Sequence, residues 1–233
     1  RREQGLADGA EIVDGEVPER VALEENGVQF TVPVHEGQKT GWFYDHRMSR
    51  ARLAPWVKGK TVLDVYSYIG GWGIQAAAFG AAEVCCLDSS VQALEGVAAN
   101  AELNGLQSRV TTLRGSAPET MASLRAESRQ FDVVILDPPA FIQRKKDLKK
   151  GFAAYRRINE LGLNLLRPGG LLVSGSCSMH LPRAELILAM QQAAVRAACQ
   201  LRVVEQGAQG PDHPIHPAIP ETEYLKAIFA RKI

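Results

Sequence analysis

Short apolar runs alternate with amphipathic stretches through most of the chain, from residue 61 to the end. The apolar runs, rich in Val, Ile and Leu, are typical of buried strands, and the stretches between them have helical length. The predicted strands are 61–65, 83–88, 108–113, 131–137, 170–176, 201–206 and 223–233. The predicted helices are 72–80, 90–104, 117–128, 146–167 and 183–200. This alternation predicts a parallel sheet with helices on both faces.

The last two predicted strands are separated by a proline-rich segment, GPDHPIHPAIPE (210–221), with no helical pattern. Parallel neighbours need a long crossover, usually a helix, so these two strands are expected to pair antiparallel at one end of the sheet. The fold class is therefore α/β, with a seven-stranded, mostly parallel sheet and an antiparallel last strand.

The N-terminal region has a different pattern. Two alternating runs flank Asn26-Gly27, a strong signal for a β-hairpin. We therefore expect a small β-rich segment over 1–38 and one α/β domain over 39–233, which is compatible with a length of 233 residues. The chain begins with Arg1 rather than Met, which favours a fragment that lacks N-terminal sequence.

Composition narrows the possible partners. The net charge is only +1, so a nucleic acid would have to be bound by a local basic patch. No apolar run is long enough to span a bilayer, and we expect no membrane contact. The four cysteines have neither metal-binding spacing nor a dense disulfide framework, which favours a cytoplasmic protein without a structural metal.

The first strand–turn–helix unit, VLDVYSYIGGWG (62–73), indicates a nucleoside site. Gly71-x-Gly73-x-x-Ala76 satisfies a dinucleotide-binding pattern, but Tyr66–Ile69 separate the strand from the first glycine. Asp64 near the strand end would repel a diphosphate and would suit a cation. S-adenosylmethionine carries a sulfonium and an ammonium group and no phosphate, so we favour it over NAD.

Asp88 ends the second strand, eighteen residues past Gly70, about where an acid accepts both ribose hydroxyls. That acid serves NAD and S-adenosylmethionine equally. Two structural interpretations stay open: the glycines form only a turn, and Asp88 only caps the following helix.

The segment FDVVILDPPAF (131–141) brings Asp137 to the carboxyl edge of the sheet, where open α/β folds bind ligands. Pro138 and Pro139 hold the next residues extended, and Phe141 is available to pack on a planar base. The run that follows, 143–157, has seven Lys or Arg against one Asp. It is either a solvated helix face or a surface for phosphates. The predicted base and RNA contacts are Pro138, Phe141, Arg144, Lys145, Lys146, Lys149, Tyr155 and Arg156.

Cys177 follows the predicted strand 170–176 between two serines, at the same sheet edge as Asp137. The other three cysteines are interpreted as small buried hydrophobes. A Cys177 thiolate could add to C6 of cytosine and make C5 nucleophilic towards a sulfonium methyl. A protonated or hydrogen-bonded Asp137 could stabilise the charge that develops towards N3. Cys177 and Asp137 are the predicted catalytic residues.

Several motifs together resemble the ribosomal large-subunit methyltransferase I family, whose members use S-adenosylmethionine to make 5-methylcytosine in 23S rRNA. These motifs are EGQKTGWFYDHRMSR, VLDVYSYIGGWG, LDPPAF, YRRIN, SGSCSMH and DHPIHPAIPETEYLKA. The resemblance implies a class I, Rossmann-like methyltransferase fold, Cys177 as nucleophile, and a catalytic part without the N-terminal PUA-type domain of the family. It also implies cofactor contacts from Thr40, Phe43, Asp45, Arg47, Asp64, Tyr66, Ser67, Tyr68, Gly70, Asp88, Ser89, Ser116, Ala117, Asp137 and Pro139.

The chain departs from the family at two places. Ser116 stands where an acid tends to receive the adenine amino group, and Pro139-Ala140 offers no second cysteine, so the base that removes the C5 proton is unidentified. Two alternatives stay open: methylation of an exocyclic amine or guanine ring nitrogen, which needs no thiol, and a non-catalytic RNA-binding module. A homodimer is compatible with the sequence.

Overall fold

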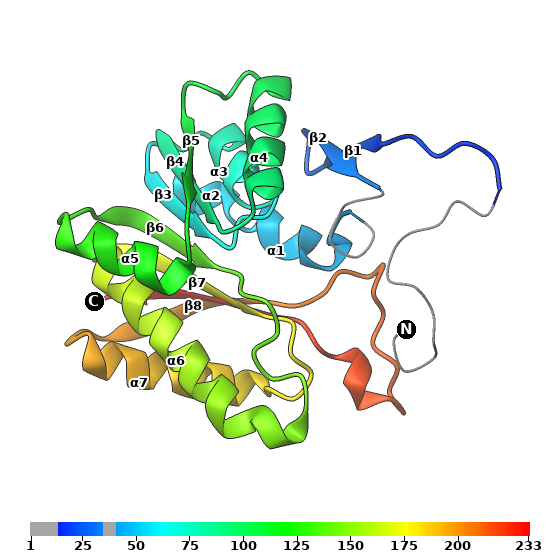
Figure 1. The fold of residues 1–233 in the computed structure, drawn as a ribbon. Coiled ribbons are helices and arrows are strands. Elements are labelled where there is room, and N and C mark those ends of the chain that lie inside the picture. Colours follow the sequence, from blue (N-terminus) through cyan, green and yellow to red (C-terminus); the bar gives the residue numbers. More distant parts are fainter. Residues whose placement is uncertain (1–13, 35–40) are drawn as a thin grey trace.

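The computed structural model describes residues 14–34 and 41–233, and within them seven strands form one sheet in the order β5-β4-β3-β6-β7-β9-β8 (Figure 1). β9 pairs antiparallel with both β7 and β8, whereas the other pairs are parallel. The strands are β3 Thr61–Val65, β4 Glu83–Asp88, β5 Val110–Arg114, β6 Phe131–Leu136, β7 Leu166–Ser176, β8 Leu201–Gly207 and β9 Lys226–Lys232. The predicted sheet and its antiparallel last strand are confirmed.

Helices cover both faces of this sheet (Figure 1). The longer helices are α3 Gly73–Ala78, α4 Val91–Leu103, α5 Ala117–Ala126, α6 Leu148–Leu165 and α7 Arg183–Arg196. The short ones, which the apolar pattern did not predict, are η2 Tyr44–His46, α1 Arg47–Ala51, α2 Ala54–Val57, η3 Lys145–Asp147 and η4 Pro220–Thr222. Among the described helices none is both long and apolar enough to cross a bilayer.

The core has two halves, one on each face of the sheet. Side chains alternate along a strand, so Val133 and Ile135 of β6 join the cluster under α3 and α4. Val134 and Leu136 join the cluster under α5, α6 and α7. A sheet buried on both faces gives near-continuous apolar strands, which is why the strands were readable from the sequence.

One strand begins earlier than predicted. β7 starts at Leu166, directly after α6, and its register with β6 shifts between Phe131 and Val133. The sequence Pro168-Gly169-Gly170 reads as a turn, and Gly169 indeed has a φ of +76°. The segment with the turn sequence is therefore part of β7, at the irregular start of the strand where the register shifts.

The N-terminal hairpin, β1 Arg20–Glu25 and β2 Val28–Pro33, is confirmed, with positive φ at Asn26 and Gly27. Its apolar side, Val28, Phe30 and Val32, joins the same core cluster as α3 and α4. Two asparagines of α4 complete the outer edge of β2: Asn100 Oδ1 accepts from Thr31 N at 2.8 Å and Asn104 Oδ1 from Gln29 N at 3.1 Å. The boundary predicted between residues 38 and 39 lies outside the described residues.

Candidate functional site

The ends of four adjacent strands bring together the residues on which the predicted chemistry depends. Asp64 lies near the end of β3, Asp88 ends β4, and Asp137 and Cys177 directly follow β6 and β7. Because β4, β3, β6 and β7 are neighbours and parallel, these ends lie along one edge of the sheet.

Asp64 is fully buried and half satisfied. Its Oδ2 accepts from Gly73 N at 2.8 Å, whereas the buried Oδ1 has no hydrogen-bond partner among the residues that the structure describes. Burial raises the pKa of Asp64 to about 7; the Gly73 N–H opposes this rise, and the carboxylates of Asp137 and Asp88 add to it. An ionised carboxylate held this way gains from a cation placed at Oδ1.

The loop after β3 is held in an unusual conformation. Tyr66 and Tyr68 have φ of +65° and +50°, a region that L residues rarely adopt. Backbone N–H groups fix the loop to β4: Tyr66 and Ser67 donate to Leu87 O at 2.9 and 3.1 Å. The Ser67 hydroxyl is buried without a hydrogen-bond partner. The loop therefore presents its side chains at the sheet edge at the expense of backbone strain.

Asp88 organises the next turn. Its Oδ2 accepts from Tyr68 N at 2.9 Å and its Oδ1 from Ser90 N at 3.0 Å. The N-cap of α4 is Ser90, whose Oγ accepts from Ala93 N at 3.2 Å, so Asp88 is not the helix cap. A cavity of about 230 Å³ adjoins this turn, and its lining residues are Tyr66, Leu87, Asp88, Ser89, Gly115, Ser116, Ala117 and Pro118.

This cavity brings together five of the predicted cofactor contacts, which come from three different strand ends. Its polar groups are the Asp88 carboxylate and the hydroxyls of Tyr66, Ser89 and Ser116. A nucleoside with a cationic tail fits this donor and acceptor set.

Asp137 is held as an anion. Trp72 Nε1 donates to its Oδ2 at 2.9 Å, and His46 Nε2 lies 3.2 Å from its Oδ1. Burial alone would raise the pKa of Asp137, but His46, the Trp72 hydrogen bond and the charge of Arg50 outweigh burial and lower it. Asp137 is therefore suited to accept hydrogen bonds, which argues against the protonated form considered from the sequence.

Cys177 is partly exposed at the end of β7, whereas Cys85 and Cys86 lie in the core as predicted. Cys199, which was also expected to be buried, is instead partly exposed. The serines on either side fix the chain here. Ser176 Oγ donates to Tyr155 Oη at 2.9 Å, and Ser178 N donates to Ser176 Oγ at 3.2 Å. The backbone at Gly175 lies against Asp137, because a Cβ on Gly175 would stand 2.9 Å from Asp137 Oδ1.

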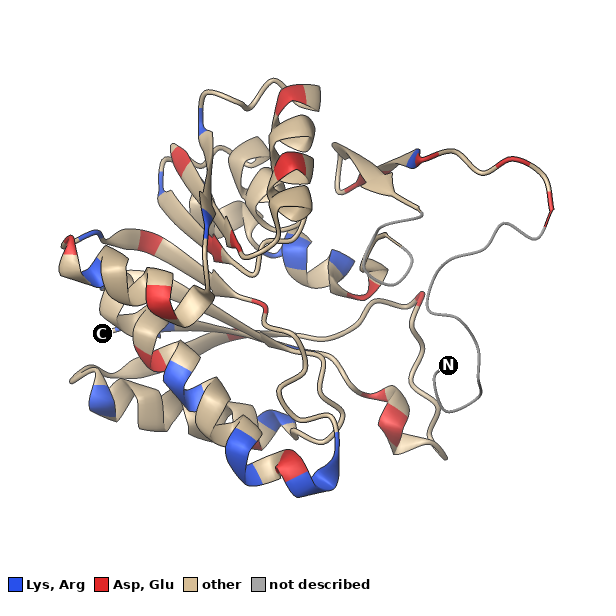
Figure 2. Cartoon of the chain, in the orientation of Figure 1, with Lys and Arg blue, Asp and Glu red and all other residues tan. Residues whose placement is uncertain are grey.

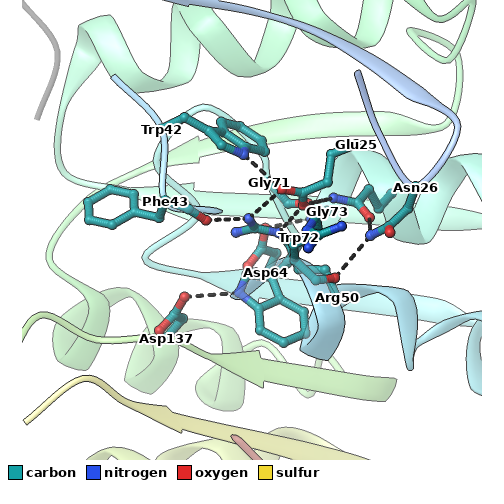
Figure 3. Close-up of polar contacts among 12 residues, drawn as sticks. Glu25, Asn26, Trp42, Phe43, Arg50, Asp64, Gly71, Trp72, Gly73 and Asp137 are labelled. Atoms are coloured by element: carbon teal, nitrogen blue, oxygen red, sulfur yellow. Dashed lines mark hydrogen bonds and ion pairs between the residues drawn. The ribbon is translucent and has the colours of Figure 1, made fainter. Parts of the chain in front are cut away.

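A buried ionic cluster adjoins Asp64 and Asp137 (Figure 3). Arg50 donates to Glu25 from Nε at 2.6 Å and from Nη2 at 3.0 Å. Trp42 Nε1 and Gln75 Nε2 each donate to the same carboxylate at 2.8 Å. Arg50 also donates to Phe43 O. The cluster ties the hairpin, the 42–50 segment and α3 together.

Three predicted residues of the 42–50 segment have protein partners. The Phe43 ring lies 5.9 Å from the Tyr68 ring, edge to face. Tyr224 Oη donates to Asp45 Oδ2 at 2.9 Å, and Arg47 Nη2 lies 3.2 Å from Asp212 Oδ1, so both residues hold the segment before β9. Asp45 Oδ1 is buried without a hydrogen-bond partner. Thr40 lies outside the described residues.

Basic side chains gather where η3 leads into α6 (Figure 2). Arg144, Lys145, Lys146 and Lys149 are exposed there, and Arg156 is partly exposed. Tyr155 is different: it is fully buried, so the RNA contact predicted for it is corrected. Tyr155 packs in the core beneath α6 and accepts a hydrogen bond from Ser176, so it stabilises the Cys177 segment.

The residues around the predicted base site differ in exposure. Pro138 is buried, so the base or RNA contact predicted for it is corrected, whereas Pro139 is exposed. The Phe141 ring packs 4.9 Å from Tyr155 and 6.4 Å from Tyr66, so one side of it already contacts protein.

Sequence reasoning missed Glu25, His46, Trp72 and Lys226. Glu25 precedes a hairpin turn, a position that is usually exposed, so nothing local marks it. Lys226 carried a usable signal, because it stands within an apolar run that forms a strand buried on both faces. Among the described residues no group of three or more His, Cys, Asp or Glu side chains could hold a metal ion.

The chain is similar to several known proteins. A family model described as S-adenosylmethionine-dependent methyltransferase matches residues 4–231. Proteins named ribosomal RNA large subunit methyltransferase I are similar: 39% identity over 237 residues in Vibrio parahaemolyticus, covering 100% of this chain and 59% of the relative. The Aeromonas salmonicida protein of that name shares 38% identity over 233 residues, covering 99% of this chain and 59% of its own length.

A solved structure from Streptococcus mutans, described as a SAM-dependent methyltransferase, superposes with a TM-score of 0.84 at 22% identity, covering 95% of this chain and 58% of that one. At that identity the similarity establishes the fold alone. The chain spans about three fifths of the length of the curated relatives it matches.

Proposed function

We propose, from the premise that the chain belongs to the family of S-adenosylmethionine-dependent methyltransferases, that it is the catalytic part of an enzyme that forms 5-methylcytosine in large-subunit rRNA. The observation that carries the proposal is the meeting of Asp137 and the Cys177 segment at the ends of β6 and β7, with Gly175 packed against the Asp137 carboxylate. The names of the relatives favour the rRNA substrate.

The cofactor would be held by the β3 and β4 ends. The carboxyl of Asp64, whose Oδ1 has no hydrogen-bond partner among the described residues, would hold the cationic group. Asp88 would accept from ribose hydroxyls, and the cavity that includes Ser116 would take the adenine. When bound, S-adenosylmethionine supplies an electrophilic methyl group on a sulfonium. The residues present fit that group, because the cavity offers the Asp88 carboxylate and hydroxyl groups, and no basic side chain lines it among the residues that the structure describes.

The protein's part in the chemistry centres on one thiolate. Cys177 Sγ adds to C6 of cytosine, and the electron pair of the C5–C6 double bond becomes available at C5. After C5 is methylated, a base removes the C5 proton. The electron pair of the C5–H bond re-forms the C5–C6 double bond and expels the thiolate, which restores Cys177. Asp137, as a carboxylate, accepts from the N4 amino group and holds the ring in register.

RNA would approach over the start of α6, where basic side chains gather (Figure 2) and Arg144, Lys145, Lys146 and Lys149 are exposed. Each lysine that contacts a phosphate adds about one unit to the slope of log K against log salt. Replacing Lys145, Lys146 and Lys149 by Ala is expected to lower that slope by about two to three units. Replacing the exposed Lys58 and Lys60, which precede β3 at the opposite edge, is the control and should leave it unchanged.

The decisive test uses RNA that contains 5-fluorocytosine. Fluorine at C5 cannot leave as a proton, so incubation with S-adenosylmethionine should accumulate a protein–RNA adduct that resists denaturation. Cys177→Ala should abolish the adduct, whereas Cys199→Ala, which changes the partly exposed thiol at the α7–β8 side, should retain it. An active Cys177→Ala enzyme would instead favour methylation of an amine or a ring nitrogen.

A further inference from the structure

Lys226 is a cation buried behind the Cys177 segment. It is the first residue of β9, only 4% exposed, and lies directly opposite Ser176 in the antiparallel register of β7 and β9. Its Nζ donates to Ser178 O at 2.6 Å. The ammonium thus reaches the residue that follows Cys177.

Among the described residues, the charge of Lys226 has no ion-pair partner. No carboxylate lies within ion-pair distance of its Nζ among the residues that the structure describes. Burial lowers the pKa of Lys226 to about 8; Cys177 and Glu223 oppose this shift, and Arg183 adds to it. Burying an ammonium without a countercharge lowers the stability of the fold, because the charge loses its hydration. Its position beside a candidate nucleophile therefore suggests a functional role.

Other titratable groups also face Cys177. Tyr155 of α6 and Tyr224 before β9 both interact electrostatically with it, and burial is the main reason that their pKa values are raised. Both phenols are therefore neutral near pH 7. Asp137, on the β6 side, is an anion that disfavours a second negative charge. Lys226 is a positive group that interacts electrostatically with Cys177, and Arg183 in turn acts on Lys226.

We propose that Lys226 is a positioning residue for Cys177: its ammonium fixes the Ser178 carbonyl and supplies the positive charge beside which the Cys177 thiol loses its proton. The role of Cys177 as nucleophile rests on the function proposed above. The proton leaves sulfur for solvent, or for the Lys226 amine where that is neutral, and in either case a thiolate faces an ammonium. A nearby cation is a general way to make a cysteine reactive at neutral pH.

The test is the pH dependence of Cys177 alkylation by iodoacetamide, which requires the thiolate but neither RNA nor cofactor. Peptide mass spectrometry separates Cys177 from the other three cysteines. Lys226→Met is expected to raise the midpoint of the alkylation profile by about one pH unit and to slow alkylation about tenfold at pH 7. Lys226→Arg should keep the midpoint near that of the unaltered protein.

Two further variants separate charge from folding. Lys226→Gln keeps a hydrogen-bond donor for Ser178 O without the charge, and it should also raise the midpoint if Lys226→Met does not fold. Lys232→Met is the matched control, because Lys232 lies on the same strand and donates to Leu163 O and Leu166 O at 2.8 and 2.7 Å, away from the site. Unchanged midpoints in folded Lys226→Gln, or an equal shift in Lys232→Met, would overturn the inference.

The outcome is distinguishable from failure of the proposed function. If the midpoint moves but the unaltered protein forms no 5-fluorocytosine adduct, the cytosine chemistry is wrong and the effect of Lys226 on the thiol stands. If the adduct forms and the midpoint does not move, only the inference about Lys226 fails. When both hold, adduct formation by Lys226→Met at pH 7 should be about tenfold slower and should recover at pH 9.

Discussion

The buried charges on the two sides of the site differ in how they are paired. Glu25 and Arg50 form a closed cluster in which the carboxylate accepts from Arg50, Trp42 and Gln75 (Figure 3). Asp64 and Lys226, at the strand ends, are just as buried, yet neither has an ion-pair partner among the described residues. Charges that satisfy each other hold elements together, whereas charges left unpaired remain able to respond to a ligand or a reacting group.

The largest effect is expected from breaking the closed cluster. Glu25→Ala leaves the Arg50 guanidinium buried without its carboxylate, which should lower the free energy of unfolding by about 3–5 kcal/mol. Replacing both residues by Met should recover most of that loss. Urea denaturation of the single and double variants measures the two values. A single variant as stable as the unaltered protein would show that the cluster does not hold the hairpin.

Removing an unpaired buried charge should instead increase the free energy of unfolding. Folding raises the pKa of Asp64 to about 7. The native state therefore loses stability relative to the unfolded state as the pH rises from about 4 to 7, and the loss is about 4 kcal/mol at pH 8. Asp64→Asn avoids that penalty but leaves an amide N–H without an acceptor, which offsets about 1–3 kcal/mol. The variant should be about 2 kcal/mol more stable at pH 8.

The gain should disappear at pH 5, where Asp64 is protonated in the native state, so urea denaturation at the two pH values checks its sign. A variant less stable than the unaltered protein at pH 8 would mean that Asp64 already has its countercharge.

A smaller effect concerns cofactor affinity. If the ionised Asp64 binds the cationic end of S-adenosylmethionine, the affinity should rise about tenfold between pH 6.0 and pH 7.5, as the carboxyl loses its proton near pH 7. Titration calorimetry at the two pH values measures this change. Asp64→Asn should bind more weakly and without the pH dependence, and an equally steep dependence in that variant would assign it to another group.

The smallest effect is expected at an exposed pair. Arg129 Nη2 and Glu83 Oε1 lie 3.4 Å apart with about half of each side chain exposed. Solvent screens such a pair, so Glu83→Gln should change the free energy of unfolding by less than about 0.5 kcal/mol. This variant sets the baseline against which the effects at Glu25 and Asp64 are judged by the same urea denaturation. A loss above 1 kcal/mol would weaken the distinction between buried and exposed charges.

The strand ends show which site residues can be predicted from local sequence. Asp64, Asp88, Asp137 and Cys177 were assigned to one sheet edge because each follows an apolar run, and parallel strands end together. The RNA contact predicted for Tyr155 is wrong. Its basic neighbours, such as Lys149 and Arg156, indicate an exposed surface, but Tyr155 lies on the buried face of α6.

The sequence by itself determined the order of strands and helices, the hairpin turn at Asn26-Gly27 and the candidate nucleophile, since apolar periodicity and turn chemistry are local properties. Only the tertiary structure decided which charges are paired. Glu25 and Arg50 are separated by half the hairpin and the 42–50 segment, and Lys226 meets the Cys177 segment because β9 inserts between β7 and β8. Pairing depends on distances between remote parts of the chain, and no local pattern encodes those distances.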